Sequence, residues 1–213
     1  MKIIVFDTET TGLPEKRNTP ITDTHRWPHV VQFSWIEINC DTSSYQLHDY
    51  YVKIAPQVNL TQESINIHGI TRDKVDKDGI DIQDGIDNFL SCVNTTDYLV
   101  GHNLEFDYNM LLVECARLGG DYLNKPHIPT SCISFCTMRY GEAICNIMVP
   151  GKNGRLYRKF PKLVELYVKL FGEEVDSYHN AKVDIICCAR CFYSMIGNEE
   201  DLFSVYPALK SEI

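Results

Sequence analysis

The sequence predicts an α/β fold with a mixed central sheet of about five strands, helices on both faces and a single domain over residues 1–213. Three observations carry this prediction. Residues 2–7 form a short apolar run typical of a buried strand, and residues 30–38 and 45–54 alternate as the two strands of a hairpin do. Downstream, short strand patterns alternate with helical ones, which is typical of a sheet with parallel strands.

Each further element has its own signal in the chain. The hairpin link is turn-like, and residues 14–29 carry three prolines and form an irregular loop. Short buried strands are expected at 97–103 and, as a fifth strand, at 127–134. Apolar spacing and helix start and stop residues predict helices at 61–67, 71–75, 81–95, 104–120, 160–172 and 181–197.

The composition excludes several classes of protein. No segment approaches the roughly 18 consecutive apolar residues of a membrane span. The first apolar run, which Asp7 ends, is too short for a signal peptide. Nine cysteines, an odd number in a chain of this length, favour reduced thiols. We therefore expect an intracellular protein, cytoplasmic or nuclear, without a membrane partner.

The cysteine spacing leaves two interpretations open. Cys188 and Cys191 form a C-x-x-C pattern, and Cys132 and Cys136 form a looser pair. Zinc binding is one interpretation of such spacing. Residues 187–191 lie within a predicted helix, however, which favours small apolar core residues.

Charge is unevenly distributed along the chain. The net charge of −9 argues against tight, sequence-independent binding of nucleic acid. Residues 151–162 nevertheless contain five Lys or Arg residues and no acid, with Tyr157 and Phe160 between them. Cations for phosphates and rings for stacking suit a nucleic-acid single strand. A solvated loop with two aromatic anchors is the alternative interpretation.

Two carboxylates stand at the end of the first predicted strand. Asp7 and Glu9 are two residues apart, so on a strand they point to the same face. Neighbouring carboxylates repel one another and are costly to bury unless a cation lies between them. Hard oxygen ligands of this kind suit Mg²⁺ or Mn²⁺. A polar strand end that meets water is the alternative.

Two other segments place acids among apolar neighbours. Asp107 lies one turn into the predicted helix 104–120, beside Phe106. His179 lies in the approach to the helix 181–197, and Asp184 lies within that helix. Taken singly, such residues are more often surface or capping residues. Three segments of this kind in one chain favour a common site.

Together, the three segments resemble the motifs of the DEDDh 3′→5′ exonucleases, the DnaQ-like family that includes the epsilon proofreading subunit of bacterial DNA polymerase III. The resemblance covers residues 1 to 196 or so, and residues 63–71 also fit the family. The histidine five residues before the last acid indicates the DEDDh subclass, because the sister subclass has tyrosine where this chain has Asn180. The matching segments are Asp7-Thr8-Glu9-Thr10-Thr11-Gly12-Leu13, then Gly101-His102-Asn103 with Asp107, then His179 with Asp184.

The resemblance implies a ribonuclease H-like (exonuclease) fold and a two-metal mechanism. It implies that two divalent ions, Mg²⁺ or Mn²⁺, are held by Asp7, Glu9, Asp107 and Asp184. It makes His179 the general base that takes a proton from the attacking water. The products would be nucleoside 5′-monophosphates released from the 3′ end.

The resemblance also assigns contacts to the 3′-terminal nucleotide. Thr10, Thr11 and Leu13 would grip it, with Leu13 as a wedge against the terminal base. Glu63 and His68 fall where the family contacts the same nucleotide. Phe106 would stack or pack beside Asp107; core packing is the alternative for Leu13 and Phe106.

The expected partner is a nucleic acid 3′ end, with single-stranded DNA favoured. RNA is an alternative, because the motifs do not read the 2′-hydroxyl. A polymerase or other replication protein is a further expected partner. A catalytically inactive module that binds nucleic acid or a polymerase is the alternative from another class, although such relics normally lose a metal ligand or the histidine.

Overall fold

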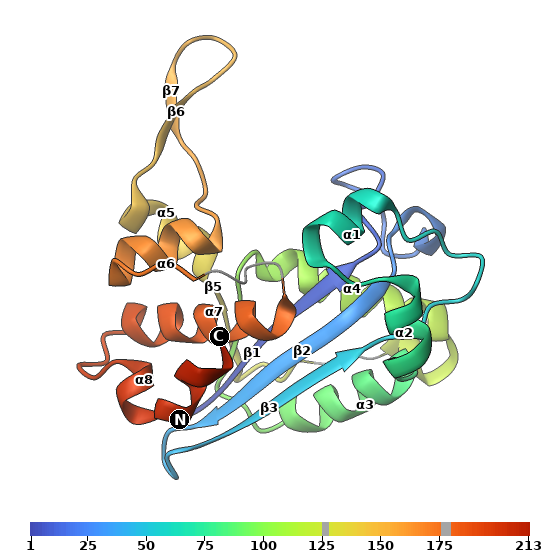
Figure 1. Ribbon diagram of the computed structural model, residues 1–213, viewed down its shortest axis with the longest axis horizontal. Helices are drawn as coiled ribbons and strands as arrows, with labels where there is room; N and C mark the ends of the chain where they lie inside the picture. Colours follow the sequence, from blue (N-terminus) through green and yellow to red (C-terminus); the bar gives the residue numbers. More distant parts are fainter. Residues whose placement is uncertain (125–127, 176–179) are drawn as a thin grey trace.

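The structure is a computed structural model that describes residues 1–124, 128–175 and 180–213. Its centre is a five-stranded sheet in the order β3-β2-β1-β4-β5 (Figure 1). β1 pairs antiparallel with β2 and parallel with β4, while β3 and β5 form the edges. The predicted mixed sheet is confirmed. Its strands are β1 (Lys2–Thr10), β2 (Val30–Asn39), β3 (Ser44–Tyr51), β4 (Tyr98–Gly101) and β5 (Ile133–Cys136).

Helices cover both faces of this sheet, as predicted. On one face, α6 and α7 pack over the side chains of Ile3 and Val5. On the other, α3 and α4 pack over Ile4 and Phe6. The main helices are α1 (Gln62–His68), α2 (Arg72–Asp78), α3 (Ile82–Val93), α4 (Leu104–Leu118), α5 (Thr137–Cys145), α6 (Leu163–Phe171), α7 (Ala181–Met195) and α8 (Leu202–Val205), with short 3-10 helices at Thr24–Arg26, Gly120–Asn124 and Pro207–Glu212.

β1 is the central strand, and this explains its continuous apolar run. A strand with helices over both faces buries successive side chains on opposite sides. Ile3, Ile4, Val5 and Phe6 are all buried accordingly. Face alternation then continues into the polar part of the strand, so Asp7 and Glu9 share the face that α7 covers.

Several strand boundaries differ from the prediction, and the differences in β1 and β5 matter most for the site. β1 was predicted to end at residue 7 but continues to Thr10, because Glu9 still pairs with Gln32 of β2. The two carboxylates therefore lie within the strand rather than at its end. The fifth strand was predicted at 127–134, whereas β5 begins at Ile133 and follows β4 in parallel register.

The segment between β5 and α6 departs most from the prediction. α5 was not predicted, and Gly141 at its centre allows close contact with Leu166 of α6, which a larger side chain would block. No strand was predicted in the basic segment 151–162, for which a solvated loop was one of two interpretations and whose last residues were expected to begin a helix. Instead, β6 (Met148–Pro150) and β7 (Leu156–Arg158) form an antiparallel hairpin that projects from the body of the molecule (Figure 1).

The cysteine cluster on α7 lies in the core. Cys187, Cys188 and Cys191 are buried, free thiols among the apolar residues beneath β1. Among the described residues, none of these cysteines lies close enough to two other His, Cys, Asp or Glu side chains to share a metal ion with them. This favours the core interpretation over zinc binding. No helix in the described ranges is long and apolar enough to span a membrane.

Candidate active site

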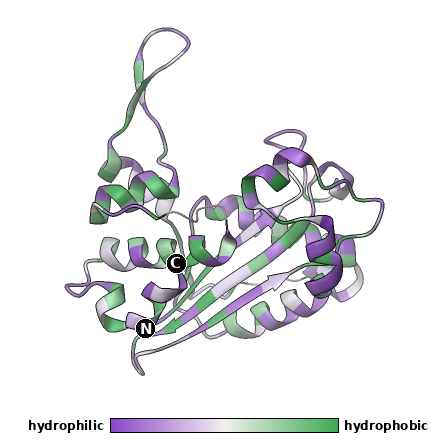
Figure 2. Ribbon diagram, viewed as in Figure 1, coloured by the Kyte–Doolittle hydropathy of each residue, from purple (hydrophilic) through white to green (hydrophobic). Residues whose placement is uncertain are grey.

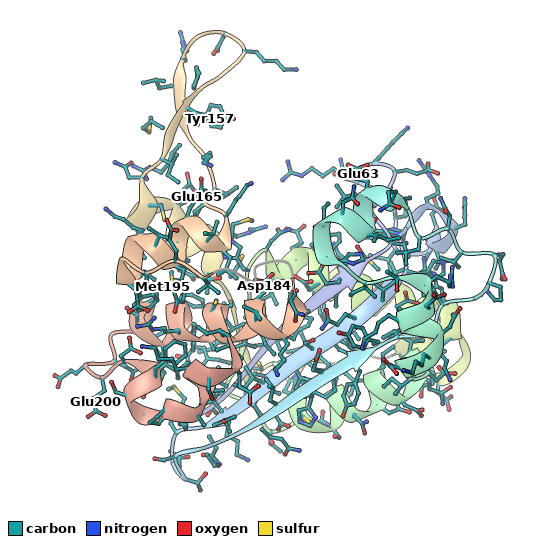
Figure 3. The ribbon with its side chains drawn as sticks, in the orientation of Figure 1. Glu63, Tyr157, Glu165, Asp184, Met195 and Glu200 are labelled. Atoms are coloured by element: carbon teal, nitrogen blue, oxygen red, sulfur yellow. The ribbon has the colours of Figure 1, made fainter. Side chains whose placement is uncertain are left out.

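The predicted acids of the first and third motifs converge at one place. Asp7 and Glu9 on β1 meet Asp184, which lies in the first turn of α7. One carboxylate oxygen from each of the three lies within 4.8 Å of the others. Figure 3 shows Asp184 at the start of α7, below the hairpin and α1 in that view. The sheet supplies two of these carboxylates and the helix above it supplies the third.

Asp107 joins the group through Thr8. It lies in the first turn of α4 and is only 3% exposed. Its Oδ1 atom accepts hydrogen bonds from the Thr8 backbone N–H at 3.0 Å and from the Thr8 hydroxyl at 2.7 Å. The pairing of β1 with β4 ends at Val5 and Val100, so Asp107 satisfies a backbone donor that β4 no longer reaches.

Burial and mutual repulsion raise the pKa values of Asp7, Glu9 and Asp107. Burial first, and then the charges of Asp107, Asp184 and Glu9, raise the pKa of Asp7 well above its ordinary value. Burial first, and then the charges of Asp184 and Asp107, raise the pKa of Glu9 to about 8. Burial raises the pKa of Asp107 to about 7, against the opposing effect of the Thr8 hydrogen bonds. A divalent cation would reverse this cost, and an all-oxygen donor set fits Mg²⁺ or Mn²⁺.

Neutral amides hold the helix that carries Asp184. Asn180 caps α7 by accepting a hydrogen bond from the Lys182 N–H at 3.1 Å. Gln32, opposite Glu9 on β2, accepts from the Ala181 N–H at 3.3 Å through its Oε1 atom. Gln32 is 1% exposed, and its position anchors the start of α7 to the sheet. This contact was not predicted, because its only signal in the sequence is a glutamine inside an apolar strand.

The turn after β1 is braced by its own polar groups. The Thr10 hydroxyl donates to the Gly12 carbonyl at 2.7 Å. The Thr11 hydroxyl accepts from the His29 N–H at 3.0 Å, and the Thr11 N–H donates to the His29 carbonyl at 2.9 Å. Ser64 of α1 donates to the Thr11 carbonyl at 2.8 Å. Thr10 and Thr11 therefore fix the shape of the turn, and their contact with a nucleotide stays a prediction.

His68 braces the same turn from α1. Its Nδ1 atom accepts from the Ile70 N–H at 3.0 Å, which leaves the proton on Nε2. Nε2 then donates to the Thr10 carbonyl at 3.3 Å. His68 is buried, whereas Glu63 of the same helix is exposed (Figure 3). Glu63 is therefore accessible for the predicted contact with the nucleotide. His68 would affect the nucleotide only through the turn that it positions.

A pocket of about 330 Å³ lies between the loop after β1 and the start of α4. Leu13 and Phe106 both line it. Leu13 is 81% exposed, so the core-packing alternative is wrong for this residue. Phe106 is half-buried against the core and also faces the pocket. Leu13, predicted to wedge against the terminal base, and Phe106, predicted to stack or pack beside Asp107, therefore line one cavity.

One predicted residue cannot be placed. His179, the predicted general base, lies outside the described residues. Asn180, the next residue, is described at the start of α7, one turn before Asp184. The four predicted metal ligands are all described, and the fold brings them together near the carboxyl end of β1, the central strand.

Comparisons with known proteins agree with this geometry. In solved structures, the fold matches E. coli exonuclease I in complex with a dT13 oligonucleotide at a TM-score of 0.64 and 15% identity, over 99% of this chain and 42% of that chain. It matches a 3′-exonuclease that recognises a histone mRNA stem-loop at 0.62 and 18%, over 92% and 63%. It matches exonuclease X in complex with 5′-overhanging duplex DNA at 0.57 and 18%, over 95% and 98%. At identities this low, structural similarity establishes the fold and nothing further. The fold is the predicted ribonuclease H-like exonuclease fold.

The chain spans less than half the length of the exonuclease I chains it matches. A search of curated protein sequences gives no match. The sequence model of the Exonuclease family matches residues 4–192, which contain all four converging acids. The chain therefore belongs to the Exonuclease family.

Proposed function

We propose that this chain is a DEDDh 3′→5′ exonuclease that removes nucleotides from single-stranded DNA and releases nucleoside 5′-monophosphates. The observation that carries the proposal is the convergence of Asp7, Glu9 and Asp184 within 4.8 Å, with Asp107 bonded to the same strand. Clustered acids with raised pKa values, as Asp7, Glu9 and Asp107 have, are typical of a catalytic centre. In this proposal residues 1–213 form a single exonuclease domain.

Two divalent ions, Mg²⁺ or Mn²⁺, are the proposed cofactors. Asp7, Glu9, Asp107 and Asp184 would hold them, and bound there they would activate a water and stabilise the leaving 3′ oxygen. The protein's own contribution is to keep the ligands in place. Thr8 keeps one oxygen of Asp107 engaged and so leaves the other for a cation.

His179 is the proposed general base. An imidazole with an ordinary pKa near 6.5 can accept a proton from water at neutral pH. The residue precedes Asn180, whose cap fixes the start of α7 against the sheet. This placement in the sequence supports the DEDDh subclass.

The pocket between Leu13 and Phe106 is the proposed site for the 3′-terminal nucleotide. Its volume of about 330 Å³ falls within the range of small-ligand sites. An exposed Leu13 at its rim suits a wedge against the terminal base. Glu63 would contact the nucleotide from α1, and Thr10, Thr11 and His68 would shape the turn beneath it.

The substrate class is proposed from the catalytic residues and from similar structures. Those structures hold a single-stranded oligonucleotide, an overhanging DNA duplex and an mRNA stem-loop. The first favours single-stranded DNA, and the last makes RNA the second candidate. A polymerase or replication partner remains a separate proposal.

A degradation assay tests the function. DNA and RNA strands of one sequence, labelled at the 5′ end, are incubated with the protein and Mg²⁺, Mn²⁺ or EDTA. We expect a ladder of shortened DNA in either metal, none in EDTA and none with Asp7→Ala. Asp41→Ala is the matched control, because Asp41 is an exposed acid at the opposite end of the sheet, paired with the N-terminus. No ladder on either strand would contradict the proposal, and faster loss of RNA would reassign the substrate.

A further inference from the structure

The β6–β7 hairpin is unusual because it buries almost nothing. Its strands pair through Met148 with Arg158, Val149 with Tyr157 and Pro150 with Leu156. Gly154 closes the tip at a φ of +76°, a conformation that favours glycine. Every residue from Lys152 to Arg158 is exposed (Figure 1). A two-stranded hairpin without a packed face is at best marginally stable in water.

The hairpin exposes apolar side chains that a surface loop does not need. Leu156 is 63% exposed and Tyr157 is 54% exposed, with Met148 and Phe160 nearby at 47% and 48%. Figure 2 shows apolar as well as polar residues along this arm. Exposed apolar side chains gathered on one projection mark a binding surface more often than a solvated one.

The hairpin also carries cations without the acids that neutralise them elsewhere. Between Glu142 and Glu165 the chain has five Lys or Arg residues and no acid, although the whole chain has a net charge of −9. Lys159 pairs with Glu165 at 2.5 Å at the base of the hairpin. In the part of the chain that the structure describes, Lys152, Arg155 and Lys162 form no ion pair. These charges are available to a polyanion.

The base of the hairpin is fixed to the edge of the sheet that holds the acids. His102 follows β4 directly and lies in the turn that leads to Asp107. Its Nε2 atom donates to the Pro161 carbonyl at 3.0 Å, and its Nδ1 atom lies 3.0 Å from the Thr137 hydroxyl. Thr137 begins α5 and Pro161 precedes α6, so one histidine ties both ends of the hairpin segment to the catalytic edge.

We propose that the β6–β7 hairpin is a binding arm for single-stranded nucleic acid, which holds the strand several nucleotides upstream of the 3′ end. The proposal rests on the proposed exonuclease function. Its cations would contact phosphates, and Tyr157 would stack on an unpaired base. A duplex hides its bases, so it could use the cations but not the aromatic and aliphatic side chains. The exposed apolar residues therefore favour a single strand over a duplex.

Such an arm makes binding depend on the length of the strand. A strand of about 3 nucleotides would occupy only the catalytic edge, whereas one of about 20 would also reach the arm, because single-strand sites cover roughly 4–16 nucleotides. Loss of the arm should therefore weaken binding of the long strand and leave binding of the short strand unchanged. Removal of two phosphate contacts should also reduce the slope of log KM against log salt by about 1.4.

The test compares hairpin variants with a control of equal charge. Lys152→Ala with Arg155→Ala removes two cations from the tip, and Lys77→Ala with Lys210→Ala removes two exposed cations elsewhere. We expect the tip variant to raise KM for the long strand about 10-fold or more, with the reduced salt slope, and to leave kcat/KM for the short strand unchanged. Tyr157→Ala should raise the same KM about 10-fold without changing the salt slope. Equal effects on both lengths, or the same loss in the control, would overturn the proposal.

Direct binding separates this proposal from the proposed function. Fluorescence anisotropy of a labelled strand of about 20 nucleotides, measured in EDTA, reports the arm without turnover. Weaker binding by the hairpin variants, with no degradation by the wild type in metal, would keep the arm and refute the nuclease. Degradation with unchanged binding would keep the nuclease and refute the arm. If Tyr157→Ala weakens binding of a blunt duplex as much as binding of the single strand, the preference for single strands is contradicted.

Discussion

Thr8 supplies a test of how the protein prepares Asp107 for a cation. Thr8→Val keeps the shape of the side chain but removes the hydroxyl that donates to Asp107 Oδ1 at 2.7 Å. The backbone N–H of the same residue still donates at 3.0 Å, so the carboxylate keeps one of its two donors from β1. The variant therefore changes the electrostatics of the site without removing a metal ligand.

The expected size of the effect follows from the hydrogen bond. A hydrogen bond to a charged group contributes about 1.5–3 kcal/mol, which corresponds to about one to two pKa units. Since burial already raises the pKa of Asp107 to about 7, loss of the donor should move it higher still. A cation must then displace a proton at neutral pH, and apparent affinity at pH 7 should fall about 5- to 50-fold.

Calorimetric titration with Mn²⁺ at pH 7 and at pH 9 measures this effect. The deficit of Thr8→Val should shrink at pH 9, where the carboxyl of either protein loses its proton more readily. Thr96→Val is the control, because it removes a buried hydroxyl that donates to the Lys2 carbonyl at 3.1 Å, at the opposite end of β1. A deficit as large at pH 9 as at pH 7, or an equal one in the control, would refute the reasoning.

Two further predictions concern stability. Arg190→Met should lower the free energy of unfolding, measured in urea, by about 2–3 kcal/mol. This is less than the loss for a fully buried ion pair, because the carboxylate partners Glu173 and Asp201 are partly exposed. An unchanged urea midpoint would contradict this prediction. In EDTA, stability should fall by about 2 kcal/mol between pH 6.5 and 8, because folded Glu9 (pKa about 8) and Asp107 (pKa about 7) hold protons that the unfolded chain has released. Burial lowers the pKa of His29 and His102 to about 4, so these two residues make stability rise with pH, mostly below the unfolded histidine pKa of about 6.5. Stability that rises between pH 6.5 and 8 would refute the assignment.

The sequence predicts the central sheet well because its strands bury side chains in regular patterns. The hairpin of β2 and β3 alternates, and β1 is apolar until Asp7. The same criterion ends β1 too early, because a run of polar residues looks like a strand end even where pairing with β2 continues to Thr10. An apolar pattern indicates which residues face the core, whereas backbone pairing with a neighbouring strand can continue beyond the apolar residues.

Elements that contact little of the core leave a weaker signal. The β6–β7 hairpin has no buried face, so no alternation marks its strands. α5 contains a central Gly141, which local propensity counts against a helix. Close packing against Leu166 gives that glycine a reason, but only the tertiary structure reveals it.

The candidate site divides in the same way. The acids are recognisable because charged residues in apolar surroundings need an explanation, and the fold brings Asp7, Glu9 and Asp184 together. The residues that position them are not recognisable in sequence. Thr8 and Gln32 are neutral, common in strands and silent until the structure supplies their partners. Their roles depend on contacts between segments far apart in the chain.

The measurement that tests the central claim most directly is the fate of the attacking oxygen. A single turnover on single-stranded DNA in water enriched in oxygen-18, with Mg²⁺, gives products whose masses locate the label. Hydrolysis at the acid cluster predicts one labelled oxygen in the 5′-phosphate of the released mononucleotide and none in the shortened strand. Label in the shortened strand, or release of fragments in place of mononucleotides, would contradict the account.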